Sequence, residues 1–389
     1  MKAKHAPDNL GGQHLMEKRI AIIGGGIVGA TAAYYLSTLP GHPNVQVTLF
    51  DSGTGQASKA AAGIISPWLS KRRNQQWYRL AKDGADLYPQ LIHDAHLGTD
   101  VYQQTGTIVT REVPTDLEAL ADLAVKRQAT AAGMGRITTL SAQEVQQRVP
   151  LLTAPQPGVF LSGGARVDGA ALVNALLTRA SEQNLTVRHE AVTLTPDERV
   201  VSSLGARQFD RVIVAVGAWT KDLLATLGVT ARVRPQKGQL IELAVKDYPL
   251  QENMPVVMPE GERDFIPFGH GHLIVGATHE DDKGFDLTPD TDVTEDLLAS
   301  AQRLVANVTA ADITTVRVGT RAYTDDFAPF FGPIPDHERF LVASGLGSSG
   351  LTTGPQIGRL LAGSALYGGT PDWSEYEKPL TTYLTPSLA

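Results

Sequence analysis

The chain has 389 residues, of which 42% are hydrophobic and 19% are charged. This length exceeds what one compact domain usually holds, and the composition is far from that of a disordered chain, so we expect two domains. With 34 basic and 41 acidic residues the net charge is −7, which favours a small-molecule partner over a nucleic acid or an anionic membrane. The absence of cysteine excludes disulfides, thiolate nucleophiles and cysteine-bound metals or cofactors.

The first residues carry no folding signal. Residues 1–16 are polar and lack an apolar run, so we expect a loose leader outside the fold. The uncharged stretch 20–36 follows three charged residues, as in a secretion signal, but it is short and has three glycines at its centre. We therefore expect a soluble, cytoplasmic protein that does not span a membrane.

A strand, a tight turn and a helix are predicted next. Residues 19–23 form a short apolar run, and Gly24-Gly25-Gly26-Ile27-Val28-Gly29 follows it. In such a unit Gly24 makes the turn, Gly26 lets the backbone approach a pyrophosphate, and Gly29 lets the helix pack on the strand. The helix N-terminus favours the negative charge of that group.

The following strand supports a dinucleotide site. Residues 45–50 alternate like a strand and end at Asp51, 22 residues after Gly29. A carboxylate at this position binds the ribose hydroxyls and repels a 2′-phosphate. This unit disfavours NADP and leaves NAD and FAD open.

The continuation resembles one family in motif order. Ser58 to Gly63 resembles the S-x-x-x-A-G segment of the family of glycine oxidases, D-amino-acid dehydrogenases and sarcosine oxidases (the DAO family). Residues 209–219 resemble its V-I-x-A-x-G-A-W strand, and residues 234–239 its P-x-x-G-Q turn. Residues 319–332 match its G-x-R-x-x-T-x-D-x-x-P-x-x-G pattern at every position. The resemblance covers about residues 17 to 370.

The resemblance implies an α/β fold. It has an FAD-binding, Rossmann-like domain of the glutathione-reductase type and a second α+β substrate domain built on an antiparallel sheet. We expect residues 17–68, 156–232 and 318–389 to form the discontinuous FAD domain, and residues 69–155 and 233–317 the substrate domain. Within the latter we expect an amphipathic helix in 68–96, an edge strand near 101–109, and antiparallel strands at 240–243, 256–258 and 272–275.

The implied cofactor is non-covalent FAD, since cysteine is absent and no histidine lies in 57–68, where some relatives attach the flavin. A strand at 340–343 and a glycine-rich loop should lead into a helix at 356–366, whose N-terminus suits the charge that grows on the flavin during reduction. The residues expected to contact FAD are Gly24, Gly26, Ile27, Val28, Gly29, Asp51, Ser52, Ser58, Ala61, Ala62, Gly63, Ile64, Val192, Gly217, Trp219, Gly345, Gly347, Ser348, Ser349, Gly350, Leu351 and Thr352.

The implied reaction is dehydrogenation of a carbon–nitrogen bond beside a carboxylate, with hydride passing to the flavin. The substrate would be a D-amino acid, glycine or a sarcosine-like N-substituted amino acid, and oxygen or a quinone would accept the electrons. Arg321 is the expected carboxylate ligand, because a guanidinium can pair with a carboxylate through two hydrogen bonds. The alternative for Arg321 is an ion pair with Asp325 or Asp326.

Two positions depart from the glycine oxidases, which carry a tyrosine where Asp264 stands and a second arginine where Ser348 stands. Asp264 either attracts a cationic group of the substrate or turns to solvent, because an unpaired buried carboxylate is costly. His279 is a candidate for the substrate site. His270 and His272 indicate a hairpin turn rather than a metal site.

Two other functions remain open. One is a 2-hydroxy-acid dehydrogenase on the same scaffold, which would need a base to take the hydroxyl proton, with His279 the eligible side chain. The other is an FAD-carrying module that modifies a macromolecular partner, although the negative charge disfavours RNA. The sequence leaves the oligomeric state undetermined.

Overall fold

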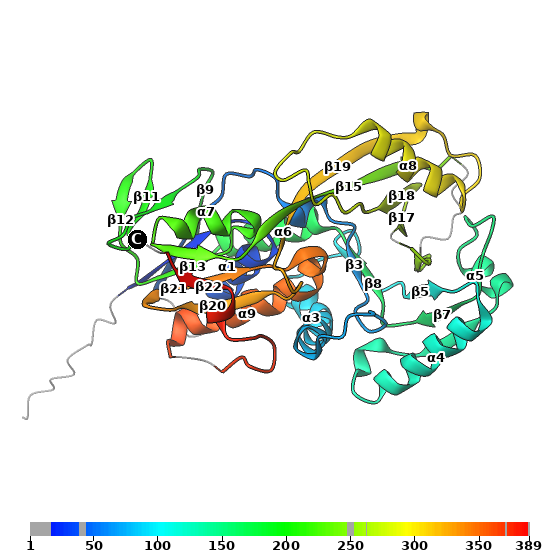
Figure 1. The fold of residues 1–389 in the computed structure, drawn as a ribbon, viewed down its shortest axis with the longest axis horizontal. Coiled ribbons are helices and arrows are strands. Elements are labelled where there is room, and N and C mark those ends of the chain that lie inside the picture. The colour runs from blue at the N-terminus through cyan, green and yellow to red at the C-terminus, as the bar shows by residue number, and fades with distance from the viewer. Residues whose placement is uncertain (1–16, 39–43, 247–252, 262, 370–371, 388–389) are drawn as a thin grey trace, which may run out of the picture.

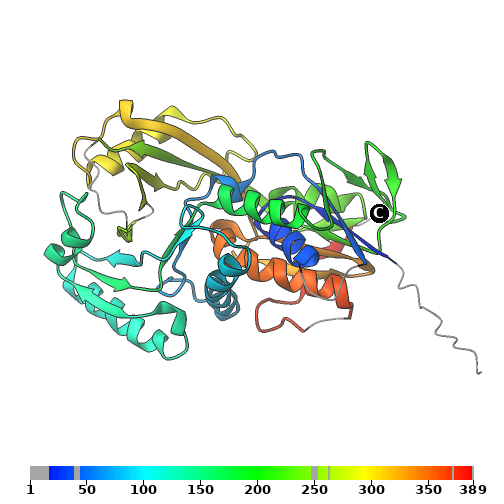
Figure 2. The same cartoon turned by 180° about the vertical axis from the view of Figure 1, so that it is seen from behind.

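The computed structural model describes residues 17–38, 44–246, 253–261, 263–369 and 372–387, and the expected leader 1–16 lies outside them. Two large sheets lie toward opposite ends of the molecule, and the long strands β15 (Arg234–Ala244) and β19 (Ile313–Tyr323) reach from one toward the other (Figure 1). The view from behind shows the same arrangement (Figure 2). Among the described residues, no helix is both long and apolar enough to cross a membrane.

The first sheet is the predicted parallel one. Its order is β20-β21-β13-β1-β2-β9, all pairs are parallel except the edge pair β20–β21, and the order reverses between β1 and β13. In sheets of this kind a ligand binds beyond the carboxyl ends of the strands at such a reversal. The strands are β1 (Lys18–Ile23), β2 (Val45–Phe50), β9 (Leu185–Arg188), β13 (Arg211–Val214), β20 (Phe330–Ile334) and β21 (His337–Ser344).

The strand β1 shows why this sheet needs cover on both faces. Ile20 and Ile22 belong to one hydrophobic cluster and Ala21 and Ile23 to another, and all four are buried. A strand buried on both faces reads as a continuous apolar run, which is the pattern of its sequence. On the first face α1 packs between α6 and α9. These helices are α1 (Ile27–Thr38), α6 (Gly169–Ser181) and α9 (Gly350–Tyr367).

The second sheet has the order β19-β15-β18-β17-β16-β5-β7-β6 and is antiparallel except for the pair β16–β5. The three expected strands 240–243, 256–258 and 272–275 lie in it. The expected edge strand near 101–109 is wrong, because β5 pairs on both sides and lies inside the sheet. The further strands are β5 (Thr107–Thr110), β6 (Ile137–Leu140), β7 (Gly158–Leu161), β16 (Val256–Met258), β17 (Asp264–Gly269) and β18 (His272–Gly276).

The residue ranges of the two domains stay a prediction. The strand pairing does not follow two of the predicted boundaries, those at residues 156 and 318. The strand β7 and the whole of β19 pair within the eight-stranded sheet, although residues 156–232 and 318–389 are expected in the FAD domain. The long β15–β19 ladder is continuous, so residues 313–323 belong to one structural element.

The remaining elements complete the layers. The amphipathic helix α3 begins after Asn74, whose side chain accepts a hydrogen bond from the Trp77 amide, and it lies within the predicted 68–96. The other helices are α2 (Ala57–Ala60), α3 (Gln75–Asp94), α4 (Pro114–Gln128), α5 (Ala142–Arg148), α7 (Thr220–Ala225) and α8 (Thr291–Gln302). The smaller sheets contain β3 (Ile64–Ile65), β4 (Tyr102–Gln103) and β8 (Ala165–Val167); β10 (Thr193–Leu194), β11 (Val200–Ser202) and β12 (Gly205–Arg207); and β14 (Val229–Ala231) with β22 (Leu384–Pro386).

Candidate active site

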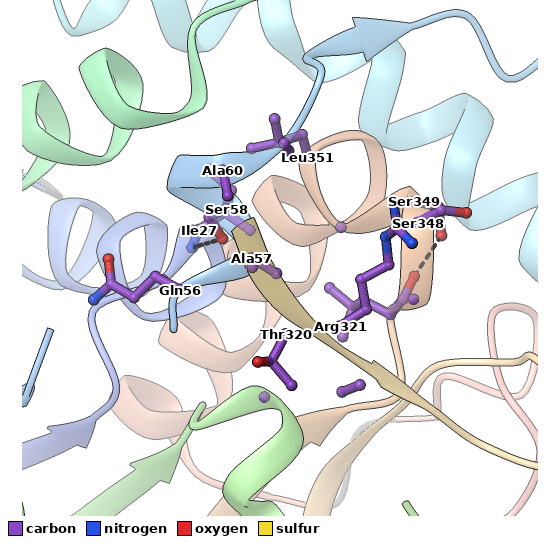
Figure 3. Close-up of a pocket in the computed structure, with 18 of the residues that line it drawn as sticks. Ile27, Gln56, Ala57, Ser58, Ala60, Thr320, Arg321, Ser348, Ser349 and Leu351 are labelled. Carbon is purple, nitrogen blue, oxygen red and sulfur yellow. Dashed lines mark hydrogen bonds between the residues drawn. The ribbon is translucent and has the colours of Figure 1, made fainter. Parts of the chain in front are cut away.

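A cavity of about 830 Å³ is lined by residues of both large sheets. It runs from the first glycine turn, past the N-terminus of α9, to side chains of β17 and β19. Its volume is near the upper end of the range for ligand pockets, as an extended dinucleotide with a substrate beside it requires. In the close-up view, Gln56 lies on one side of the cavity and Arg321, Ser348 and Ser349 on the other (Figure 3).

The glycine turn at the end of β1 has the geometry predicted for it. Gly24 has φ +105°, and a Cβ atom there would lie 2.3 Å from the Ala215 carbonyl oxygen. A Cβ at Gly29 would lie 1.9 Å from the Gly24 oxygen, so a side chain would push the helix from the strand. At Gly26 the nearest atom to an added Cβ is Ser58 Oγ at 3.3 Å, which leaves this residue open to the cavity.

Ser58 ties the small-residue segment to the start of α1. The Ile27 amide donates a hydrogen bond to Ser58 Oγ at 3.0 Å (Figure 3). At the end of β2, Asp51 accepts a hydrogen bond from Gln56 and lines the cavity. The expected adenine-side residue Val192 lines it as well.

The helix α9 begins at Gly350, six residues before the predicted start at 356, so the predicted loop is shorter. Gly354, which is expected in the loop, and Gly358, which is expected in the helix, both lie in α9, and α1 packs tightly on them. A Cβ at Gly354 would lie 2.6 Å from the Ile27 side chain, and one at Gly358 would lie 2.6 Å from the Val28 oxygen. Glycine is therefore needed here for close helix packing rather than for a loop conformation.

Arg321 lies on β19 and lines the cavity. Its Nη1 donates hydrogen bonds to Gln236 Oε1 at 3.0 Å and to the Thr278 oxygen at 2.7 Å, both neutral acceptors. A Cβ at Gly238 would lie 2.7 Å from its Cζ, so the absence of a side chain there makes room for the guanidinium. Burial lowers the pKa of Arg321, and Tyr323 and Glu280 oppose this shift.

The ion pair considered for Arg321 is wrong. Asp326 pairs instead with Lys378 at 2.6 Å, and Asp325 is exposed. Within the described ranges no ion pair joins Arg321 to an acidic side chain. The guanidinium is therefore fixed in position by neutral acceptors, and the carboxylate that acts on its pKa, Glu280, is not in an ion pair with it.

Asp264 begins β17 and lines the cavity, where it is half-buried, and its attraction for a cationic group of the substrate stays a prediction. Burial raises the pKa of Asp264 to about 7. His279 lines the cavity and is exposed. His270 lies in the hairpin turn between β17 and β18, and His272 begins β18, as predicted.

The structure gathers nearly all of the predicted site residues around this one cavity. Of the FAD-contact set, Gly29 and Gly345 are the two that do not line it, since Gly29 packs against Gly24 and an added Cβ at Gly345 would lie 2.8 Å from Thr324. The contacts of the others with a cofactor stay a prediction.

Two arginines in the cavity wall were missed. Arg72 precedes α3 and Arg111 follows β5. Each lies far along the chain from Arg321 and belongs to no motif. The one available signal was the basic run 71–73 directly after the FAD-binding segment.

The cavity fits a bound FAD. The Gly26 backbone is open to the cavity, as the pyrophosphate of FAD requires, and a carboxylate stands at the end of β2, where it can bind the ribose. The N-terminus of α9 also faces the cavity, and it suits the negative charge of the flavin ring. The family model described as FAD dependent oxidoreductase (DAO) matches residues 19–364.

The chain belongs to the DAO family of FAD-dependent oxidoreductases. An uncharacterized oxidoreductase, YurR, of Bacillus subtilis (strain 168) is 38% identical over 89% of this chain and 94% of its own length. A glycine oxidase of Pseudomonas putida KT2440 is 30% identical over 87% and 92%. The crystal structure of iminodiacetate oxidase from Chelativorans sp. BNC1 superposes with a TM-score of 0.85 at 32% identity, covering 94% of this chain and 98% of that one.

Proposed function

We propose that this FAD-dependent oxidoreductase oxidises the carbon–nitrogen bond beside a carboxylate in an amino acid or an N-substituted amino acid. The observation that carries the proposal is Arg321, a half-buried cation held by neutral acceptors in the cavity wall. The similarity to proteins named glycine oxidase and iminodiacetate oxidase supports an amine as the reacting group.

FAD, when bound, supplies the hydride acceptor, and the protein orients the substrate and handles its proton. Arg321 pairs with the substrate carboxylate and thereby fixes the position of the neighbouring carbon. An amine must lose its proton before it can release a hydride from that carbon. Asp264 is the proton acceptor in this proposal, because its pKa of about 7 suits a base that works near neutral pH.

The Asp264 carboxyl group also supports the alternative function, oxidation of a 2-hydroxy acid, because it is a second candidate base beside His279. A base with a pKa of about 7 in the cavity could take a hydroxyl proton as well as an ammonium proton. The two functions therefore have to be separated by the substrates themselves.

The test is an anaerobic screen that follows the loss of flavin absorbance. Its panel comprises D-amino acids, glycine, N-methylglycine, N-carboxymethyl amino acids, proline and 2-hydroxy acids. We expect amines with a neighbouring carboxylate to reduce the flavin. Reduction by hydroxy acids alone would overturn the amine proposal. Reoxidation with air or with a soluble quinone then distinguishes the electron acceptors.

The variant Arg321→Met tests the carboxylate role. Loss of a charge-assisted hydrogen-bonded pair costs about 1.5–3 kcal/mol, so kcat/KM for acid substrates should fall by about 10- to 150-fold. Arg317→Met, which removes an arginine of the same strand outside the cavity, is the control. An unchanged KM for acids in Arg321→Met would remove the proposed role.

A further inference from the structure

A second guanidinium lies in the same cavity. Arg72 stacks over the Trp77 ring at 4.6 Å, and its Nη2 donates a hydrogen bond to Ser348 Oγ at 3.2 Å. Trp77 is itself fixed, because its Nε1 donates to Ser349 Oγ at 3.0 Å. The Arg72 head is therefore held between an aromatic ring and the loop that precedes α9.

One end of this guanidinium is left unsatisfied. The Arg72 Nη1 atom is buried and, within the described part of the chain, has no hydrogen-bond partner. Burial lowers the pKa of Arg72, and the partner that opposes this shift is the Tyr323 phenol, not a carboxylate. An arginine remains a cation even so, and removing one of its nitrogens from water without a counter-ion is costly. The arrangement suits a ligand that brings a negative charge.

Tyr323 links Arg72 to Arg321. The phenol also opposes the burial shift of Arg321, and its hydroxyl accepts a hydrogen bond from the Ser348 amide at 3.0 Å. The Ser348 hydroxyl contacts Arg72 and the Ser348 amide contacts Tyr323, so one loop residue joins the surroundings of the two guanidinium groups. Among the described residues Arg72 has no acidic partner, and the carboxylate that acts on Arg321, Glu280, makes no ion pair with it.

The third arginine of the cavity is less available. Arg111 is 8% exposed, its Nη1 donates to the Thr110 oxygen at 2.6 Å, and its Nε lies 3.8 Å from a Glu260 carboxylate oxygen. It has an acidic neighbour, whereas Arg72 has none within the described ranges. Arg72 is thus the better ligand for a further anion.

We propose that Arg72 binds a second carboxylate of the substrate, so that the enzyme acts on amines bearing two carboxylates, one on Arg321 and one on Arg72. This inference rests on the proposed function for the oxidised bond. It adds the substrate class, a dicarboxylic amine. Two structures share this chemistry, an N-carboxymethyl amino acid and an amino acid with an acidic side chain.

The first test measures binding alone. Diglycolate, which joins two carboxymethyl groups through an ether oxygen, and methoxyacetate, which has one carboxylate, are titrated into the oxidised FAD holoenzyme. The flavin absorbance change reports binding. We expect diglycolate to bind about tenfold or more tightly than methoxyacetate in the wild type. Arg72→Met should abolish this preference and leave methoxyacetate binding unchanged.

Arg73→Met is the matched control, because Arg73 is the exposed neighbour of Arg72 and does not line the cavity. It should keep the full preference for diglycolate. Arg72→Gln removes the same charge but keeps a polar group near Ser348, and it provides the test if Arg72→Met does not retain FAD. A preference that survives loss of the charge would overturn the proposal. Equal weakening of both ligands would also overturn it and would assign Arg72 to the cofactor or the fold.

The second test uses reduction of the flavin. Iminodiacetate is compared with its mono-amide, and D-aspartate with D-asparagine, since each pair differs in one charge and little in shape. We expect the diacid of one pair to have a KM about tenfold lower, and Arg72→Met to raise that KM with little change in kcat. The pair in which the diacid has the lower KM shows whether the two substrate carboxylates are spaced as in iminodiacetate or as in D-aspartate. If no amine reduces the flavin while diglycolate binding still depends on Arg72, the proposed reaction fails and the second carboxylate site stands.

Discussion

The two ends of the cavity are built on different principles. At the dinucleotide end the wall consists mainly of backbone and small side chains, because glycines at the end of β1 let the main chain approach a ligand. At the opposite end the wall carries charged side chains, including Arg72, Arg111, Asp264 and Arg321, which come from four separate segments. In the proposed function, one end recognises the shape and charge of the FAD cofactor, and the other end selects the substrate.

The largest expected effect comes from breaking the backbone end. In Gly24→Ala the new Cβ would lie 2.3 Å from the Ala215 carbonyl oxygen at a φ of +105°. The steric clash and the unfavourable backbone conformation both displace the turn, so we expect the free energy of unfolding to fall by about 3 kcal/mol or more and bound FAD to be lost. The flavin content of the purified protein and its Tm measure the two effects.

The control separates the clash from the backbone conformation. Gly205 has φ +86° and open space around an added Cβ, and it does not line the cavity. Gly205→Ala should cost only about 1 kcal/mol and leave the flavin content unchanged. Equal flavin content in Gly24→Ala and Gly205→Ala would show that close approach at the turn is not required.

This difference between the two ends also explains why the sequence predicted the dinucleotide end of the cavity better than the charged end. A backbone site needs glycines at fixed spacing within one strand–turn–helix unit, so the order of residues from Gly24 to Asp51 contains the information. The start of α9 was placed too late, because Gly354, which is expected in the loop, is required by packing against α1, which no local pattern reports. Arg72 was missed for a related reason. Its position follows from contacts with Ser348 and Trp77 that exist only in the folded chain.

A smaller effect is expected from Asp264 at the charged end. Asp264 is a proton acceptor only when ionised, so kcat/KM for an amine should rise with pH and level off above its pKa of about 7. In Asp264→Asn we expect a loss of about 100-fold at the plateau, and a profile that keeps rising toward the pKa of the substrate amine. Stopped-flow flavin reduction across this range measures both.

Two outcomes would contradict this role. A wild-type profile without a change of slope near pH 7 would show that Asp264 does not take the proton. A plateau at the same pH in Asp264→Asn would assign the titration to another group.

The smallest effect concerns a buried carboxyl group away from the cavity. Glu377 is 9% exposed, its Oε2 accepts a hydrogen bond from the Phe331 amide at 2.7 Å, and burial raises its pKa to about 8. Because the folded pKa lies above the ordinary value of 4.5, the folded state binds more protons between these values. Its contribution to stability is therefore fully present below pH 4.5 and is lost as the pH rises through about 8.

In Glu377→Gln the amide oxygen can still accept the Phe331 hydrogen bond but does not titrate. We expect the Tm of the holoenzyme to match the wild type below about pH 4.5, to exceed it increasingly up to about pH 8 and to stay above it at higher pH, with unchanged kcat/KM, since Glu377 does not line the cavity. Glu375→Gln is the control, because its exposed pair with Arg79 should contribute little at any pH. Parallel Tm curves for Glu377→Gln and the wild type would show that the carboxyl group is not protonated in the fold. If the curves diverge while turnover stays constant, the pH dependence of stability and that of catalysis belong to two different carboxyl groups, Glu377 and Asp264.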